Sequence, residues 1–119
     1  GKLDAMKAEV ERAVQAVATE LGLGASIEDV GHFDPVTFDP GLVTVVRSAA
    51  ERLGHSHRDI VSGAGHDACW TARVCPTVMI MCPCEGGLSH NEAEKISPEW
   101  AKAGTDVLLH AVLDVAGVS

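Results

Sequence analysis

Apolar side chains recur at helical spacing in three long stretches of the chain, which predicts three amphipathic helices. The first covers residues 3–21 and carries Glu and Lys opposite its apolar face. The second covers residues 40–53, with Asp39 as its expected N-cap and a proline in its first turn. The third covers residues 98–117 and follows Ser97, another expected N-cap. Residues 54–97, between the second and third helices, do not show this long helical pattern.

Three further stretches have the pattern of strands. Residues 25–33 alternate loosely between apolar and acidic positions, which predicts a half-exposed strand. Residues 58–62, RDIVS, are interpreted as a short strand that leads through glycines into a short predicted helix over residues 66–74. Residues 76–82, PTVMIMC, are almost continuously apolar and predict a strand buried on both faces. Because helices separate these strands, the pattern favours an α/β fold.

A connector interrupts this alternation at residues 34–40, DPVTFDP. It contains two prolines, and the residue before a proline is disfavoured in a helix. We therefore expect a boundary between two structural units at this segment.

Composition and charge exclude several classes of protein. With 119 residues, of which 46% are hydrophobic and 22% charged, the chain suits one compact domain rather than a disordered or fibrous protein. A formal net charge of −8 opposes binding to phosphate backbones and anionic lipids, so we expect no nucleic-acid and no membrane partner. No apolar stretch could cross a bilayer, and residues 1–14 lack the apolar block of a secretion signal. We expect a soluble, cytoplasmic protein.

Four cysteines lie close together in the second half of the chain, at Cys69, Cys75, Cys82 and Cys84. Structural zinc sites usually contain paired Cys-x-x-Cys turns, and the Cys82-Pro83-Cys84 spacing does not match them. Small buried thiols in a reducing compartment are the favoured interpretation, with a structural zinc protein as a distant alternative.

Two histidine-bearing loops follow predicted strands: SGAGHDA over residues 62–68 and GGLSHN over residues 86–91. Ligands of α/β sheets gather outside the carboxyl ends of strands, so we expect both loops to face a common pocket. His66 begins a helix after two glycines and suits donation of a hydrogen bond to a developing oxyanion. The residues alone leave open a second interpretation, a tight turn in which His66 or Asp67 serves only as a helix cap.

His90 is the candidate metal ligand. A neutral imidazole is the commonest protein ligand of zinc-like ions, and Glu92 or Glu94 could orient its second nitrogen. A water-exposed loop histidine is the alternative. One histidine does not make a metal site, since three or more protein ligands are needed, and the other histidines have no ligand spacing.

Read together, SGAGHDA, ARVCPTVMIMCP, GGLSHNEAE and AGTDVLLHAVLDVAG resemble the C-terminal end of the hydantoinase/carbamoylase group of metal-dependent amidohydrolases. This group includes N-carbamoyl-L-amino-acid hydrolases, β-ureidopropionase-type enzymes and allantoate amidohydrolases. The resemblance covers most of the chain and implies an α/β fold with helices packed on a mixed sheet. Residues 1–34 are then a helix and strand of the lid or dimerisation domain, 35–40 a hinge, and 41–119 the C-terminal part of the catalytic domain.

The resemblance also implies an activity and roles for single residues. It implies hydrolysis of a linear amide or ureido C–N bond, with an N-carbamoyl-L-amino acid as substrate and two divalent ions, zinc or manganese, as cofactors. Gly65 and His66 match the substrate-binding loop, in which His66 polarises the scissile carbonyl as a catalytic residue. His90 matches a ligand of one metal ion.

Other ligands and the catalytic glutamate of that group have no counterpart in this chain. We therefore expect an isolated fragment that is inactive and binds no metal tightly. Apolar faces and sheet edges without partners promote association, so a homodimer is expected. The alternative from another class is a non-catalytic α/β binding or interaction module.

Overall fold

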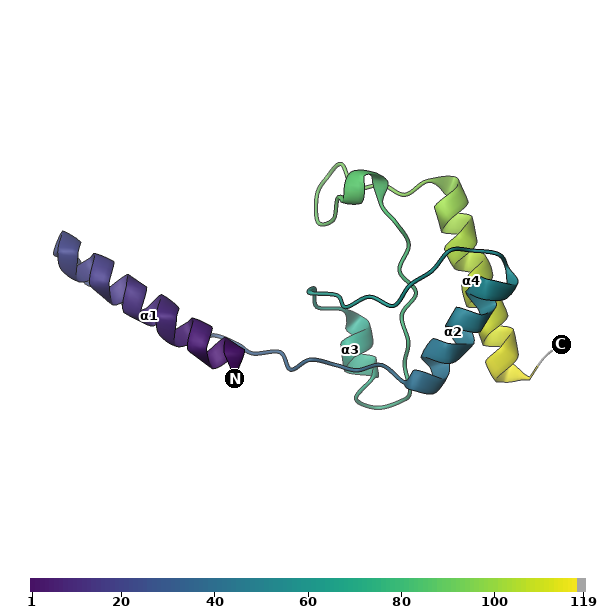
Figure 1. Cartoon of the computed structure of the whole chain (residues 1–119), viewed down its shortest axis with the longest axis horizontal. Coiled ribbons are helices and arrows are strands. Elements are labelled where there is room, and N and C mark those ends of the chain that lie inside the picture. The colour runs from purple at the N-terminus through teal and green to yellow at the C-terminus, as the bar shows by residue number, and fades with distance from the viewer. Residues whose placement is uncertain (118–119) are drawn as a thin grey trace. The chain divides into compact units, whose positions relative to one another are not determined.

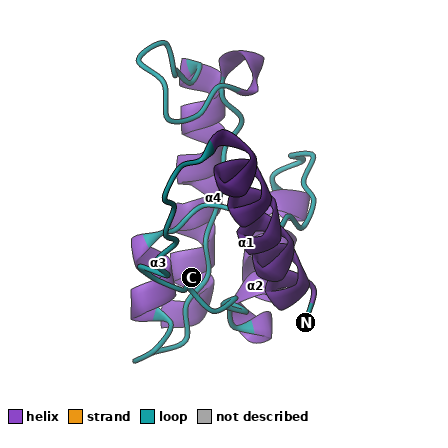
Figure 2. Cartoon of the chain, turned by 90° about the vertical axis from the view of Figure 1, so that its left-hand side faces the viewer, coloured by secondary structure: helices purple, strands orange, loops and turns teal. Residues whose placement is uncertain are grey.

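The computed structural model describes residues 1–117, which divide into two compact units, Gly1–Asp34 and Pro35 onward (Figure 1). The division falls in the proline-containing connector. Assignment of the parts to a lid, a hinge and a catalytic domain stays a prediction. The residues described are helical or extended, and none of them forms a strand (Figure 2). None of their helices is long and apolar enough to cross a membrane.

The first unit is one long helix with a return segment. Helix α1, Lys2–Leu21, ends at Gly22, whose φ of 65° lies in the left-handed region that glycine adopts without strain. The chain then runs back along the helix: Gln15 Nε2 donates to the Ala25 carbonyl at 3.3 Å, and Lys7 pairs with Asp29. The strand predicted over residues 25–33 is therefore wrong for this unit, because side chains of α1 hold the segment and no neighbouring strand does.

The second unit is built on a pair of helices. Helix α2 spans Pro40–Arg52 and helix α4 spans Pro98–Ala116, and the two pack against each other. The buried residues at their contact are small, which lets the helices approach closely: Ala49, Ala50, Val107 and Ala111. Arg52 Nη2 donates to Asp114 Oδ2 at 2.6 Å and ties the ends of the pair together.

Both of these helices begin as their sequences predicted. Asp39 Oδ1 accepts from the Leu42 amide at 2.8 Å, and Ser97 Oγ accepts from the Trp100 amide at 3.2 Å. Each side chain satisfies one backbone donor that the helix leaves unpaired. The two N-caps are therefore confirmed.

The predicted strands over residues 58–62 and 76–82 are extended but unpaired, so the expected mixed sheet is not present within residues 1–117. The second segment instead lies against the helix pair. Asp39 donates its amide to the Thr77 carbonyl at 3.0 Å, and Ile80 packs on the buried core. An apolar pattern predicts an extended, buried segment, whereas a strand also needs a partner. Helix α3, Asp67–Thr71, is shorter than the helix predicted over residues 66–74.

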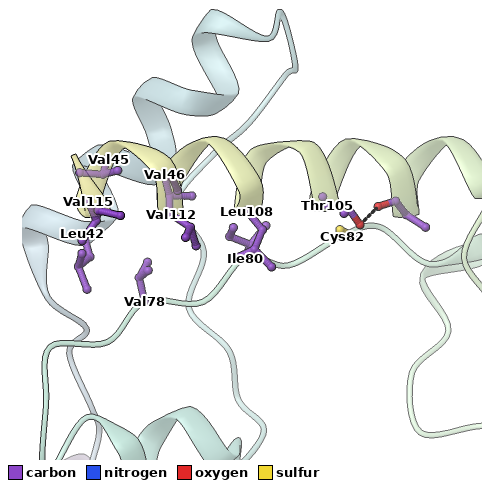
Figure 3. A pocket seen from close by; sticks show the side chains of 14 residues that line it. Leu42, Val45, Val46, Val78, Ile80, Cys82, Thr105, Leu108, Val112 and Val115 are labelled. Carbon is purple, nitrogen blue, oxygen red and sulfur yellow. Dashed lines mark hydrogen bonds between the residues drawn. The ribbon is translucent and has the colours of Figure 1, made fainter. Parts of the chain in front are cut away.

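An open apolar hollow of about 610 Å³ lies between α2, α4 and the extended segment (Figure 3). Ile80 lies next to Leu108 there, and almost the whole lining is aliphatic. At one end the segment touches α4 so closely that a Cβ at Gly104 would collide with Cys82 Sγ. Glycine at this position is therefore a packing requirement of the stem that leads to residues 84–95.

Candidate histidine site

The first histidine of the candidate site, His66, is held through its ring. It is the half-buried N-cap of α3, with an extended backbone at φ −134° and ψ 147°. Its Nε2 lies 2.7 Å from Ser62 Oγ, which also accepts a hydrogen bond from the Ala64 amide at 3.2 Å. The serine hydroxyl therefore links the ring to the backbone of its own turn.

This turn contains two glycines, Gly63 and Gly65, and the surrounding described residues do not require a glycine at either position. A Cβ at either position would meet no atom within 4 Å, and neither residue has a positive φ. Neither packing nor backbone conformation within the described residues accounts for the two glycines. A missing side chain leaves the backbone open to close approach by another group.

The second histidine, His90, is held through its backbone. Its φ of 54° is the only positive value at a non-glycine residue within residues 1–117. The His90 amide donates to Glu94 Oε2 at 2.8 Å, while Glu94 Oε1 accepts from Cys84 Sγ at 3.5 Å. The imidazole itself is exposed and has no hydrogen-bond partner among the described residues. Glu94 thus contacts the main chain of His90, and the expected contact of Glu92 or Glu94 with the ring is absent from this part of the chain.

Further hydrogen bonds close the loop from Cys84 to Lys95. The Glu85 amide donates to the Lys95 carbonyl at 2.9 Å, and the side chains of the same two residues pair at 2.9 Å. At the tip, Asn91 accepts twice, from the Ala93 amide at its side chain and from the Glu94 amide at its carbonyl, both at 2.9 Å. A short 3₁₀ helix, η1 over Glu85–Gly87, turns the chain into the loop.

The electrostatic environment of this loop disfavours a thiolate. Partial burial raises the pKa of the Cys84 thiol above its ordinary value, and the hydrogen bond to the Glu94 carboxylate raises it further. Cys84 is therefore a neutral hydrogen-bond donor to Glu94. Its role here is structural, in contrast to the reactive cysteines found beside positive charge.

The two loops do not form a complete metal site by themselves. In Figure 1 both project from the second unit on the side away from the α2–α4 pair. The loops were expected to be neighbours because they follow adjoining strand ends, and this reason is wrong for the described residues because no strand is present there. No group of three or more His, Cys, Asp or Glu in residues 1–117 is arranged to hold a metal ion. Neither imidazole lines the aliphatic hollow. The residues present fit the contribution of one ligand, His90, to a larger site.

The cysteines make no disulfide: all four thiols are free, with Cys75 exposed and the other three half-buried. The favoured interpretation of four buried thiols is therefore wrong for Cys75, and the other three are only partly buried.

Sequence reasoning missed two supporting residues, Ser62 and Cys84. Ser62 lies four residues before His66, a spacing that suggests contact in a helix but not in a glycine turn. Cys84 was considered only as a zinc ligand or a buried thiol. A polar side chain at the base of each histidine loop is the signal that could have identified both.

Comparisons with known proteins match most of the chain. The profile of peptidase family M20/M25/M40 matches residues 4–114. An N-carbamoyl-L-amino-acid amidohydrolase from Rhizobium meliloti is 67% identical over 117 residues, which cover 98% of this chain and 28% of that protein. An allantoate amidohydrolase from Escherichia coli (strain K12) is 36% identical over 87 residues, covering 73% of this chain and 21% of that protein.

Solved structures of the same group also match most of the chain. A hydantoinase/carbamoylase-family amidase from Burkholderia vietnamiensis is 49% identical, with a TM-score of 0.86 over 94% of this chain and 27% of that one. The chain thus spans roughly a quarter of the length of the relatives it matches.

Proposed function

Because this chain belongs to peptidase family M20/M25/M40, we propose that it is part of a metal-dependent amidohydrolase acting on a carbamoyl or ureido compound, as its resemblance to the hydantoinase/carbamoylase group implied. An N-carbamoyl-L-amino acid is the proposed substrate, since the relative from Rhizobium meliloti, 67% identical over 117 residues, is named for it. Water adds to the carbamoyl carbon and the bond to the amino nitrogen breaks, which gives the amino acid, ammonia and carbon dioxide. The observation that carries the proposal is the exposed imidazole of His90 on a fixed backbone.

His90 is the proposed ligand of one of two divalent metal ions, zinc or manganese. Its ring has no hydrogen-bond partner in the described chain, so a nitrogen lone pair is open to an ion. Such ions, when bound, polarise a carbonyl and lower the pKa of water. One imidazole is too few for a site, so the other ligands belong to the rest of the intact enzyme. The 119 residues alone are therefore proposed to be inactive and to hold no metal tightly.

His66 is the proposed catalytic donor to the substrate carbonyl, and Gly65 the backbone beside it. When Ser62 donates its hydroxyl hydrogen to Nε2, the neutral ring carries its own hydrogen on Nδ1. That N–H is not on the nitrogen used by the serine, so it can donate to a ligand. A donor of this kind stabilises the negative charge that develops on the carbonyl oxygen.

We also propose a homodimer in the cytoplasm. The apolar stripe of α1 remains exposed within its own unit, with Met6 exposed by 63%, Val10 by 56% and Leu21 by 62%. Exposed apolar faces of this kind favour association. The four free thiols fit a reducing compartment. A strictly monomeric sedimentation profile of the intact enzyme at high concentration would count against the dimer.

The test replaces His90 with Ala in the intact enzyme and measures bound metal and turnover of an N-carbamoyl-L-amino acid. We expect metal content and turnover both to fall strongly, because a metal ligand is lost. His32→Ala is the matched control: His32 is also an exposed histidine, but it lies in the first unit, 3.0 Å from Asp34. Unchanged metal content in His90→Ala would show that His90 is not a ligand, whereas an intact protein with no bound metal and no turnover would favour the non-catalytic binding module.

A further inference from the structure

Glu94 connects the tip of the His90 loop to its stem. One carboxylate oxygen accepts the His90 amide at 2.8 Å, and the other accepts the Cys84 thiol at 3.5 Å. Cys84 directly precedes η1, where the loop leaves the segment packed on α4. A single side chain therefore fixes the backbone of His90 relative to the folded part of its unit.

We infer that Glu94 is a positioning residue for His90: its carboxylate holds the His90 backbone in the left-handed conformation that aims the imidazole. This inference rests on the proposed function of His90 as a metal ligand. It assigns Glu94 no contact with metal or substrate.

The left-handed conformation gives the contact its importance. A non-glycine residue avoids positive φ because its Cβ approaches the carbonyl oxygen, so His90 needs compensation from its surroundings. The direction of the Cα–Cβ bond follows from the backbone angles. A return of His90 to an extended conformation would swing its imidazole to another direction, even with the loop otherwise unchanged.

The two anchors make Glu94 suitable for this task. A carboxylate held at one oxygen can still rotate, whereas contacts at both oxygens fix its plane. The amide of Glu94 also donates to the Asn91 carbonyl at 2.9 Å, which fixes its own backbone at the tip. Glu92, two residues earlier, is exposed and has no such contact among the described residues. It is therefore a matched acidic control in the same loop.

The experiment compares Glu94→Ala, Glu94→Gln and Glu92→Ala in the intact enzyme, with metal affinity measured by competition against a chelating dye. Loss of a residue that orients a ligand weakens metal binding by about 10- to 100-fold, and we expect this for Glu94→Ala. Glu94→Gln keeps an oxygen for the His90 amide, so it should recover most of the affinity. Glu92→Ala should bind metal as the unmodified enzyme does.

Hydrogen exchange of the His90 amide supplies a readout independent of activity. The amide should be protected in the unmodified enzyme and in Glu94→Gln, and exchange faster in Glu94→Ala. If Glu94→Ala does not fold, Cys84→Ala and Cys84→Ser test the second anchor: the serine should retain affinity and the alanine should lose part of it.

The outcomes separate two failures. If His90→Ala loses metal while Glu94→Ala binds as tightly as Glu92→Ala, the positioning role is wrong and the proposed function stands. If Glu94→Gln fails as badly as Glu94→Ala, the charge of the carboxylate acts on the metal and the positioning role is again wrong. If His90→Ala keeps its metal, the proposed function itself is wrong.

Discussion

The two histidine loops hold their imidazoles in opposite ways. His66 has an ordinary extended backbone and a ring fixed by Ser62, with Nε2 and Oγ 2.7 Å apart. His90 has a strained backbone, fixed by Glu94, and a ring without a hydrogen-bond partner in the described chain. The same residue type is therefore constrained at the side chain in one loop and at the main chain in the other.

This difference matches what the two proposed roles need. A metal ligand must offer an open lone pair, so any support has to reach it through the backbone or through its other nitrogen. A hydrogen-bond donor must keep its hydrogen on the correct nitrogen, so a partner on the opposite nitrogen is useful. The support found at each histidine is the kind that its proposed role tolerates.

The largest expected effect separates the roles directly. In the intact enzyme, His66→Ala should reduce kcat by about 100- to 1,000-fold, the usual cost of losing one donor to a developing oxyanion. Its metal content should remain that of the unmodified enzyme, in contrast to His90→Ala. Steady-state kinetics with metal analysis of the same samples checks both. Loss of metal from His66→Ala would show that the two histidines do not have separate roles.

Removing only the support of the ring should have a smaller effect. Ser62→Ala keeps the His66 imidazole but removes the partner of its Nε2, and we expect about a 10-fold lower kcat with unchanged metal affinity. Ser62→Thr keeps a hydroxyl at the same position and is the matched control, expected to retain most activity. A loss in Ser62→Thr equal to that in Ser62→Ala would show that the hydroxyl is not what matters.

The sequence predicted those features of the fold that depend on residues close together in the chain. The ends of α2 and α4 follow from Asp39 and Ser97, whose caps involve the next few residues. The strands could not be predicted in the same way, because residues 76–82 need a partner strand, and within the described chain they contact helices instead.

The candidate site divides along the same line. The sequences SGAGHDA and SHN identified His66 and His90 as candidates, because only a few residue types can bind a metal ion or donate a proton. Their supports were not predictable, since contacts within irregular loops have no fixed spacing. Glu94 was considered as a partner of the imidazole, whereas the left-handed backbone of His90 turns the amide toward it.

The stem of the His90 loop rests on α4, where Cys82 lies beside Gly104. Gly104→Ala should destabilise the chain in denaturant unfolding, because the new Cβ collides with Cys82 Sγ. With Cys82→Ala in the background, the same substitution should stabilise it by about 1 kcal/mol, the usual gain of Ala over Gly inside a helix. A double-mutant cycle measures this reversal. The same sign in both backgrounds would show that the sulfur does not set the spacing.

The smallest effect tests whether the two loops are independent. Burial and the Glu94 carboxylate raise the pKa of Cys84, so less of it is thiolate at a given pH and its alkylation should be slower than that of exposed Cys75 at pH values near 8. Glu94→Gln removes the negative charge, lowers the pKa of Cys84 part of the way and should speed its alkylation; burial, the larger cause, remains. Ser62→Ala should leave the rate unchanged, because the serine supports only the His66 ring. Mass spectrometry of alkylated peptides measures each cysteine separately, and a faster reaction of Cys84 in Ser62→Ala would mean that the two loops share one support.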